Sequence, residues 1–329
     1  MLSVQGLTTV VGHGPRAPSL LEDVSFTLGA GEVLGVVGES GSGKSMLALT
    51  IMDLLSQPIK RSAGRIVLDG EDLTAAGPRQ WRARRGRDLA MIFQEPMISL
   101  NPIMRVGEQI GEVLRKRKGM TAGAAEKRAL DLLERVEIPA ARQRFEAYPH
   151  ELSGGMRQRV MIAVALASDP KLLIADEPTT ALDVTIQAQI LDLLRSLQRE
   201  TGMALMLITH DLGVVAEMAH RVMVLYAGRV AEMAPVEALF DRPSHPYTQA
   251  LMASIPSLDV QSRRLATIPG SVPGVGQLPK GCRFAARCAH VRDVCRKAPP
   301  AVMPLLADHG TACLRPFGYP DPSDARVAG

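Results

Sequence analysis

The chain has few aromatic residues and no long apolar run. Aromatic side chains make up 3% of its 329 residues, which leaves few rings for stacking on bases and disfavours a nucleic-acid partner. The longest apolar run, at residues 160–167, is far shorter than the roughly 18 residues that span a bilayer. The opening MLSVQG lacks the basic start and apolar segment of a secretory signal. We therefore expect a cytoplasmic chain that does not cross the membrane.

Cysteine is absent from the first 281 residues. All four cysteines follow, at Cys282, Cys288, Cys295 and Cys313, and this asymmetry indicates a separate C-terminal module. The net charge is +4 with a pI near 9.0. Basic clusters at residues 81–87 and 115–118 are interpreted as solvated faces or faces near anionic lipid.

The apolar pattern predicts an α/β core. Short apolar runs at residues 32–37, 171–175 and 204–208 each end at a glycine-rich, acidic or polar segment, as parallel strands do. Residues 46–52 and 124–136 have helical patterns. From about residue 241 the pattern weakens, because prolines interrupt any long element; they are Pro243, Pro246, Pro256, Pro269, Pro273 and Pro279.

A complete phosphate-binding loop, GESGSGKS, occupies residues 38–45 between a predicted strand and a predicted helix. Glycines let the backbone N–H groups turn toward phosphate oxygens, Lys44 reaches the β and γ phosphates, and the Ser45 hydroxyl is a ligand for Mg²⁺. The residues predicted to hold the nucleotide here are Gly38, Ser40, Gly41, Ser42, Gly43, Lys44, Ser45 and Met46.

Two adjacent carboxylates, Asp176 and Glu177, follow the apolar run at 171–175. One carboxylate suits a Mg²⁺ ion and the other suits an attacking water, so the pair divides the two tasks of phosphoryl transfer to water. A strand-end cap is the alternative interpretation, and the phosphate loop in the same chain disfavours it.

The segment LSGGMRQR at residues 152–159 is the second informative motif. Ser153, Gly154 and Gly155 begin a predicted helix, whose free N–H groups and positive end suit a γ phosphate. The phosphate loop already supplies one such cradle in the same chain.

With the phosphate loop, this segment resembles the ATP-binding subunits of ABC transporters. The resemblance implies a P-loop NTPase fold of the α/β class. Its ABC ATPase core, RecA-like with an N-terminal β subdomain, is expected at residues 1–94 and 166–240. A helical signature subdomain is expected at residues 95–165, and a small Cys-containing C-terminal module at residues 241–329.

The resemblance also assigns roles. It implies that Asp176 is the Walker B residue and that the catalytic groups are Glu177, His210 and Gln94. Mg²⁺ would be held by Ser45, Asp176 and Gln94, and Asp183 would belong to the D-loop. Two such proteins pair head to tail, so that Ser153 to Gly155 of one subunit faces the nucleotide held by the other.

Two further segments resemble the oligopeptide, dipeptide and nickel importers within this family. They are FQEPMISLNP at residues 93–102 and PSHPYTQAL at residues 243–251. The expected function is ATP hydrolysis that drives uptake of peptides or a related small solute, on the cytoplasmic face of the inner membrane. The expected partners are a second ATPase subunit, two integral permease subunits and an extracytoplasmic solute-binding protein. A paralogue is favoured as the second ATPase, and a second copy of this chain stays open. The alternatives are an exporter subunit or a soluble ABC protein that acts on ribosomes or nucleic acid.

The cysteine spacing matches neither a CxxC zinc pair nor a common ferredoxin pattern. A bound metal is the favoured physical account, since it would order a segment too small to build its own core; a zinc ion, a disulfide and free thiols all stay open. In some members of the importer family, the pattern GCRFAARC at residues 281–288 accompanies a 4Fe-4S cluster. The resemblance extends that hypothesis to all four cysteines.

One position departs from the family pattern. Val11 stands where an aromatic ring commonly stacks on adenine. His13 or aliphatic surface would then support the base, and we expect loose selectivity between ATP and GTP.

Overall fold

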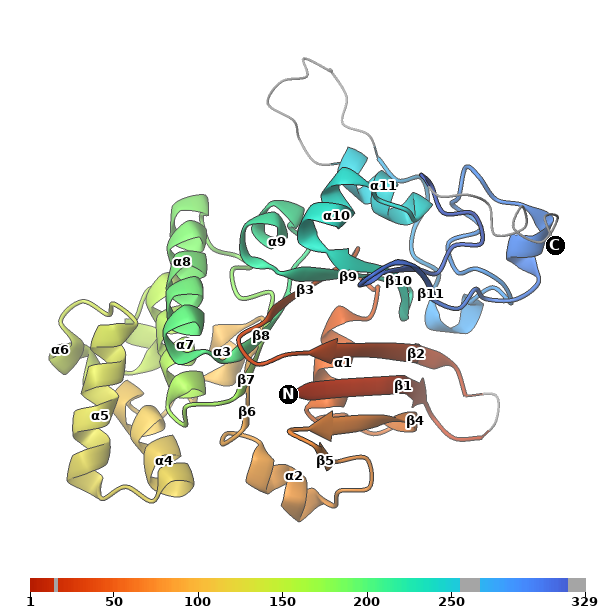
Figure 1. The fold of residues 1–329 in the computed structure, drawn as a ribbon. Helices are drawn as coiled ribbons and strands as arrows, with labels where there is room; N and C mark the ends of the chain where they lie inside the picture. The colour runs from red at the N-terminus through yellow and green to blue at the C-terminus, as the bar shows by residue number, and fades with distance from the viewer. Residues whose placement is uncertain (15–16, 255–266, 319–329) are drawn as a thin grey trace. The chain divides into compact units, whose positions relative to one another are not determined.

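The computed structural model describes residues 1–14, 17–254 and 267–318 (Figure 1). These residues fall into two compact units. Unit 1 comprises residues 1–28, 33–74 and the described residues from 209 onward, and unit 2 comprises residues 29–32 and 75–208. Of the predicted C-terminal module, residues 255–266, with Pro256, and residues 319–329 lie outside the described residues.

Unit 1 begins with an antiparallel sheet in the order β2-β1-β4-β5. Its strands are β1 (Leu2–Val11), β2 (Ser19–Leu28), β4 (Ile59–Leu68) and β5 (Glu71–Asp72). Buried and exposed residues alternate along β2, with Val24, Phe26 and Leu28 buried, which is the pattern of a strand with one face on the core.

The second group of strands in unit 1 surrounds β3 (Val33–Val37), whose five residues are all buried. β3 pairs in parallel with β9 (Arg221–Tyr226), which forms a hairpin with β10 (Arg229–Pro235). The turn between them places Ala227 and Gly228 at φ 45° and 82°, as a two-residue hairpin requires. The helices of this unit are α1 (Lys44–Ile51), α9 (Leu212–Met218), α10 (Val236–Asp241) and α11 (Pro246–Ala253).

The described part of the C-terminal module consists mostly of short elements. These are η2 (Val275–Gln277), η3 (Asp293–Arg296), β11 (Met303–Leu306) and β12 (His309–Thr311). β12 pairs with β10 and with β11, so the chain's last described strands extend the group around β3. The sequence did not predict this hairpin.

A buried carboxylate fixes the module to β10. Glu232 is fully buried and accepts hydrogen bonds from the backbone N–H groups of Ser244 and His245, at 2.7 and 2.9 Å. His309 Nε2 lies 2.8 Å from the same carboxylate. Burial opposes ionisation of Glu232, but the hydrogen bonds from His309 and Ser244 outweigh it and hold its pKa below the usual value. This network is the main polar contact between β10, the start of α11 and β12.

Unit 2 contains three parallel strands in the order β8-β7-β6. They are β6 (Leu89–Ile92), β7 (Leu172–Asp176) and β8 (Ala204–Ile208), and every residue in them is buried. The helices are α2 (Pro78–Arg84), α3 (Pro96–Ser99), α4 (Val106–Lys118), α5 (Ala122–Arg135), α6 (Ala141–Phe145), α7 (Gly154–Leu166) and α8 (Val184–Thr201), with η1 (Pro149–Glu151) before α7.

Helices α4, α5 and α7 pack on one another and form a helical group within unit 2 (Figure 1). α5 buries Ala125, Ala129, Leu132 and Leu133 along one stripe, which explains its helical pattern in the sequence. In the basic cluster at residues 81–87, Trp81 is fully buried and Arg84 and Arg87 pair with Asp88. These contacts tie part of the cluster to the protein itself, and its interpretation as a solvated face or a face near anionic lipid stays a prediction.

The predicted α/β class is confirmed, and the predicted strands and helices appear within a few residues of their expected ends. The compact units divide the chain differently from the three predicted domains, because the C-terminal module clusters with β9, β10 and the phosphate loop. The domain boundaries therefore stay a prediction.

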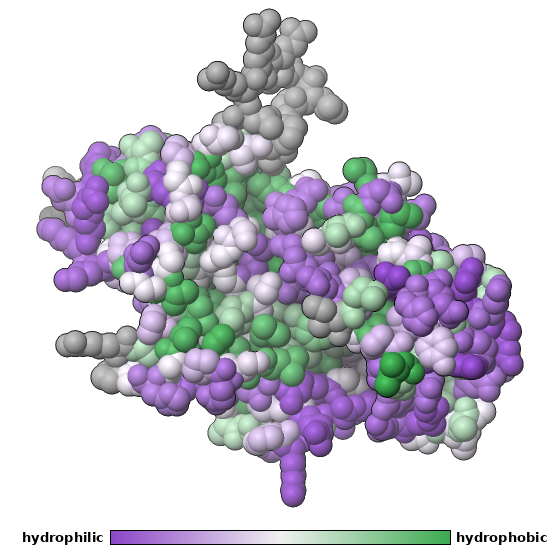
Figure 2. Space-filling model, turned by 180° about the vertical axis from the view of Figure 1, so that it is seen from behind, coloured by the Kyte–Doolittle hydropathy of each residue, from purple (hydrophilic) through white to green (hydrophobic). Residues whose placement is uncertain are grey.

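None of the helices in the described ranges is both long and apolar enough to cross a bilayer. Hydrophilic and hydrophobic side chains are interspersed over the face seen from behind (Figure 2). The exposed large apolar side chains include Phe93, Met97 and Ile103, at 37%, 49% and 83% exposure. Met97 lies in α3, and the other two lie before and after this helix in the sequence.

Candidate nucleotide-binding and hydrolysis site

The phosphate loop connects β3 to α1 in unit 1. Gly38 has φ 153°, and a Cβ there would lie 2.2 Å from the Leu225 carbonyl oxygen. Gly43, at φ 103°, caps α1 in the left-handed region that glycine favours. The glycines of the motif are thus required by the path of the backbone.

Lys44 lies at the first position of α1 and is only 6% exposed. Its Nζ donates to the carbonyl oxygens of Gly38 and Glu39, at 2.8 and 3.2 Å. The ammonium group therefore lies across the loop at the positive end of α1, which is the arrangement of a phosphate site.

His210 also belongs to unit 1 and is exposed, one residue before the N-cap of α9. The N–H of neighbouring Thr209 donates to the Val36 carbonyl, at 3.2 Å. Val36 is two residues before Gly38, so His210 lies at the same end of β3 as the phosphate loop. Asp211 fixes the following turn by accepting from Gly213 and Val214 at the start of α9.

In unit 2, the two predicted carboxylates end β7. Asp176 is 4% exposed. Glu177 is half-buried, has φ 46°, and donates its N–H to the Ile208 carbonyl at 2.9 Å. The Thr180 N–H closes the turn after β7 by donating to the Glu177 carbonyl at 3.2 Å.

Gln94 and Glu177 meet although 83 residues separate them. Gln94 Nε2 donates to Glu177 Oε2 at 3.2 Å, and Thr180 Oγ1 donates to the same oxygen at 2.9 Å. The sequence predicted Gln94 and Glu177 but missed Thr180, for which the spacing of three residues from Glu177 was the only signal. Two donors on one oxygen orient the Glu177 carboxylate.

The signature segment begins α7 in unit 2. Ser153 is exposed and caps the helix by accepting from the Met156 N–H, at 3.3 Å. A Cβ at Gly155 would lie 2.8 Å from Ile186 Cγ2, so this glycine allows α7 to approach α8. Asp183 in turn caps α8 by accepting from the Ile186 N–H, at 3.0 Å.

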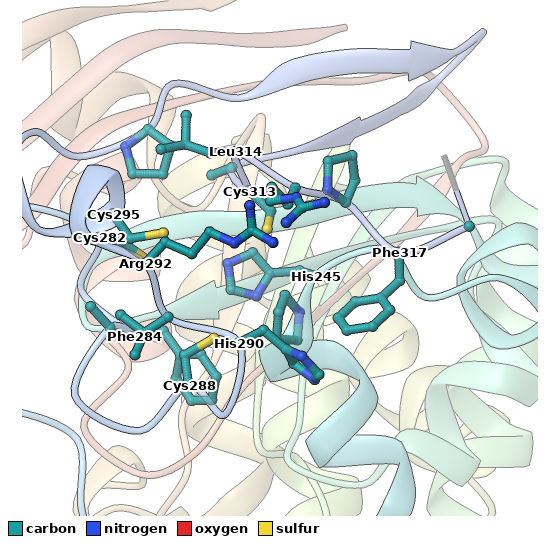
Figure 3. A pocket seen from close by; sticks show the side chains of 18 residues that line it. His245, Cys282, Phe284, Cys288, His290, Arg292, Cys295, Cys313, Leu314 and Phe317 are labelled. Atoms are coloured by element: carbon teal, nitrogen blue, oxygen red, sulfur yellow. The ribbon is translucent and has the colours of Figure 1, made fainter. Parts of the chain in front are cut away.

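All four cysteines line one cavity of about 490 Å³ in the C-terminal module (Figure 3). They come from the turn at residues 282–288, from η3 and from the segment that follows β12, and none forms a disulfide. The Cys282 N–H donates to the Cys295 carbonyl at 2.7 Å. This approach requires Gly281, where a Cβ would lie 2.2 Å from that carbonyl oxygen.

Burial raises the pKa of the thiols of Cys282 and Cys288, and raises that of Cys313 to about 11. Within residues 1–14, 17–254 and 267–318, no three His, Cys, Asp or Glu side chains converge enough to share one metal ion. The four thiols therefore line a cavity and do not converge on the position of a single metal ion. Arg292 and Arg315 line the same cavity.

Val11 is half-buried at the end of β1, and its N–H donates to the Pro18 carbonyl at 3.0 Å; His13 is exposed. The roles predicted for these two residues and for the nucleotide and Mg²⁺ ligands stay predictions.

Comparison with known proteins agrees with this geometry. Residues 21–180 match the ABC transporter family, and residues 231–295 match the oligopeptide/dipeptide transporter C-terminal region. A Brucella melitensis protein named for peptide import ATP binding is 50% identical over 327 residues, covering 96% of this chain and 97% of its own length. A Brucella abortus protein of the same description is 51% identical over 293 residues, covering 89% and 88%.

Solved structures show the same fold. The dimeric post-hydrolysis structure of the ATP-binding cassette MJ0796 with ADP and Pi matches with a TM-score of 0.65 at 28% identity, over 72% of this chain and 99% of that one. The cbiO1 protein of Clostridium perfringens, part of the ABC transporter complex cbiONQ, matches with a TM-score of 0.62 at 28% identity, over 73% and 90%. With its phosphate loop, ordered Gln94–Glu177 pair and importer-type C-terminal region, the chain belongs to the ATP-binding subunits of ABC transporters of the oligopeptide/dipeptide importer family.

Proposed function

We propose that this ABC-type ATPase uses ATP hydrolysis to drive the import of peptides or a related small solute. The observation that carries the proposal is the Glu177 carboxylate, oriented by Gln94 and Thr180, in a chain whose Lys44 spans an intact phosphate loop. The relatives' naming for peptide import favours this function over an exporter or a ribosome-directed ATPase.

The chemistry divides among the residues described. Loop N–H groups and Lys44 bind the phosphates, and Ser45 and Asp176 supply the oxygen ligands that Mg²⁺ prefers. Glu177 accepts a proton from the attacking water, and Gln94, which donates to the Glu177 carboxylate, would also be a ligand for a bound Mg²⁺ ion. His210 contacts the γ phosphate and distinguishes ATP from ADP.

Dimerisation completes the site. Ser153, Gly154 and Gly155 begin α7 with exposed or half-buried positions, so they are available to a nucleotide bound by another subunit. We propose a head-to-tail pair in which Asp183 lies at the same interface, and a paralogous ATPase as the partner. Loss of the γ phosphate would loosen this pair and drive the transport cycle.

The chain would act on the cytoplasmic face of the inner membrane, bound to two permease subunits and served by an extracytoplasmic solute-binding protein. The exposed apolar side chains of Phe93, Met97 and Ile103 support this proposal, because they offer a docking surface close to Gln94 in the sequence.

Peptide uptake by cells that express the complete transporter tests the function. A Lys44→Ala variant should abolish uptake while the subunit still co-purifies with the permeases; a Lys60→Ala variant, at a half-buried position of β4 outside the phosphate loop, is the control. Unchanged uptake with Lys44→Ala would contradict the proposal.

We further propose that Cys282, Cys288, Cys295 and Cys313 hold a 4Fe-4S cluster. The fit is favourable in two respects: the thiols surround one 490 Å³ cavity, and a cluster held by four thiolates is anionic, which suits the guanidinium groups of Arg292 and Arg315. A single zinc ion fits less well, because Zn–S bonds of about 2.3 Å require thiols that converge. A resident cluster would order the module.

Iron and sulfide analysis of anaerobically purified protein, with its visible spectrum, tests the cluster. We expect iron and a broad visible absorption that a Cys288→Ser variant reduces. Colourless, iron-free wild-type protein would refute the proposal.

A further inference from the structure

The C-terminal module contacts the phosphate loop through Arg287. The Arg287 guanidinium donates to both carboxylate oxygens of Glu39, Nη1 to Oε2 at 2.6 Å and Nη2 to Oε1 at 2.9 Å. Glu39 is the second residue of the loop, and 248 residues separate it from Arg287. The Arg287 side chain is 5% exposed and that of Glu39 is 28% exposed, so this bidentate pair is largely shielded from water.

Arg287 is held in place from several sides. Its Nε donates to the Pro269 carbonyl at 2.8 Å, and Nη2 also donates to the Ile268 carbonyl at 3.2 Å. Its guanidinium carbon lies 5.8 Å from the centre of the Tyr226 ring and 6.0 Å from that of Phe284. A guanidinium fixed in this way determines where the Glu39 carboxylate lies.

A second contact reaches the Glu39 backbone. The Glu39 N–H donates to the Tyr247 hydroxyl at 2.8 Å, and the Tyr247 ring packs on Tyr226 and Phe284. On its other side, the Glu39 carbonyl accepts from Lys44 Nζ at 3.2 Å. Glu39 therefore joins the module to the lysine that the proposed function places on the phosphates.

Arg287 belongs to the same turn as two of the cysteines. Its N–H donates to the Phe284 carbonyl at 2.9 Å, and it directly precedes Cys288. Phe284, Cys282 and Cys288 line the cysteine cavity (Figure 3). Any change in the order of this turn consequently acts on Arg287.

We infer that Arg287 is a positioning residue for the nucleotide loop: through Glu39 it holds the loop in its ATP-binding conformation and makes ATP affinity dependent on the cysteine turn. The inference rests on the proposed ATP site. A phosphate loop that is released from this contact spends less time in the ATP-binding conformation. Its apparent affinity for ATP falls in proportion to the fraction of molecules in that conformation.

Arg283 provides a matched control within the same turn. It is also a buried arginine, but it pairs with Glu22 and donates to the Ala227 carbonyl, with no hydrogen bond to the phosphate loop. Arg283→Ala and Arg287→Ala should both lower the melting temperature of the full-length chain. If Arg287 is only a structural anchor, both variants should affect nucleotide binding equally.

The measurement is equilibrium binding of a non-hydrolysable ATP analogue with Mg²⁺ to full-length protein. We expect Arg287→Ala to raise Kd about tenfold, within the range typical of coupling between two sites, and Arg283→Ala to leave it within twofold. Glu39→Gln, a change at a partly exposed position, should reproduce the rise without loss of folding and should add nothing in the Arg287→Ala background. Equal shifts for the two arginine variants, or unchanged Kd in Glu39→Gln, would overturn the inference.

Cys288→Ser tests the connection to the turn. It should raise Kd in otherwise wild-type protein and have no further effect in the Arg287→Ala background. An equal rise in both backgrounds would show that the cysteine does not act through Arg287. Wild-type protein that binds no analogue would instead refute the proposed ATP site.

Discussion

The phosphate loop and the cysteine cavity are the two ligand sites proposed for unit 1, and they are built in opposite ways. The loop is contiguous: eight successive residues fix the backbone path and place the lysine. The cavity is assembled from cysteines at 282, 288, 295 and 313, on a turn, a short helix and a strand end. The ligand of a contiguous motif can be predicted from the sequence. For residues that are dispersed along the chain, only the fold shows which of them line the same cavity.

The largest expected effect is that of Glu177→Gln, which tests ATP hydrolysis at the carboxylate after β7. It removes the proton acceptor and should lower the hydrolysis rate by about 100- to 10,000-fold, while ATP binding persists because the phosphate loop is intact. Phosphate release and nucleotide binding measured on the same preparation give the result. Glu200→Gln, on the surface of α8, is the control, and hydrolysis retained by Glu177→Gln would refute the assigned role.

Glu232→Ala tests how far the stability of the C-terminal module depends on the buried Glu232 carboxylate of β10. The change leaves the donors of Ser244, His245 and His309 without their shared acceptor, and loss of one partner in a buried polar network costs about 3–5 kcal/mol. We expect that loss in the free energy of unfolding, measured by denaturant titration, and faster proteolysis after residue 241. The exposed Glu237→Ala variant should behave as wild type; equal stability of both variants would contradict this account.

His245 should make the stability of the module depend on pH. Burial lowers the pKa of His245 from 6.5 to about 4, although Glu232 nearby raises it. Below pH 6.5 the unfolded chain therefore binds a proton that the folded chain excludes, so unfolding becomes easier as pH falls from 6.5 toward 4. The slope from this group approaches about 1.4 kcal/mol per pH unit.

Denaturant titrations at pH 7, 6 and 5 measure that slope. His245→Asn removes the titrating group while offering an acceptor for the Tyr247 N–H that His245 Nδ1 now accepts. The variant should show a shallower decline, and an unchanged slope would rule out His245 as its source.

The smallest expected effect concerns the base. Since Val11 replaces the usual aromatic residue, Val11→Tyr should tighten ATP binding by about 1 kcal/mol, the lower end of the stacking contribution of an aromatic side chain. Competition between ATP and GTP for wild-type protein is the companion measurement. A strong wild-type preference for ATP would contradict the expected loose selectivity.

The sequence predicted the strands and helices that position the nucleotide motifs because each is encoded locally. β3, β7 and β8 are continuous apolar runs, and α5 has a clear apolar stripe. The role of Gln94 was implied only by the family resemblance, and its contact with Glu177 was not predicted. Thr180 was missed although it lies only three residues from Glu177, and the β11–β12 hairpin was missed because its strands have only four and three residues. The Arg287–Glu39 pair was missed because 248 residues separate its partners, so no local pattern records it.

The hairpin of β11 and β12 has a consequence for solubility. β12 pairs with Glu232 and Met233 of β10, and β11, which includes Pro304, becomes the outermost strand. A proline removes one backbone donor from an open strand and discourages pairing with another molecule. The strands β11 and β12 thus cover the edge of β10. A chain truncated before residue 303 would expose that edge to aggregation by strand pairing.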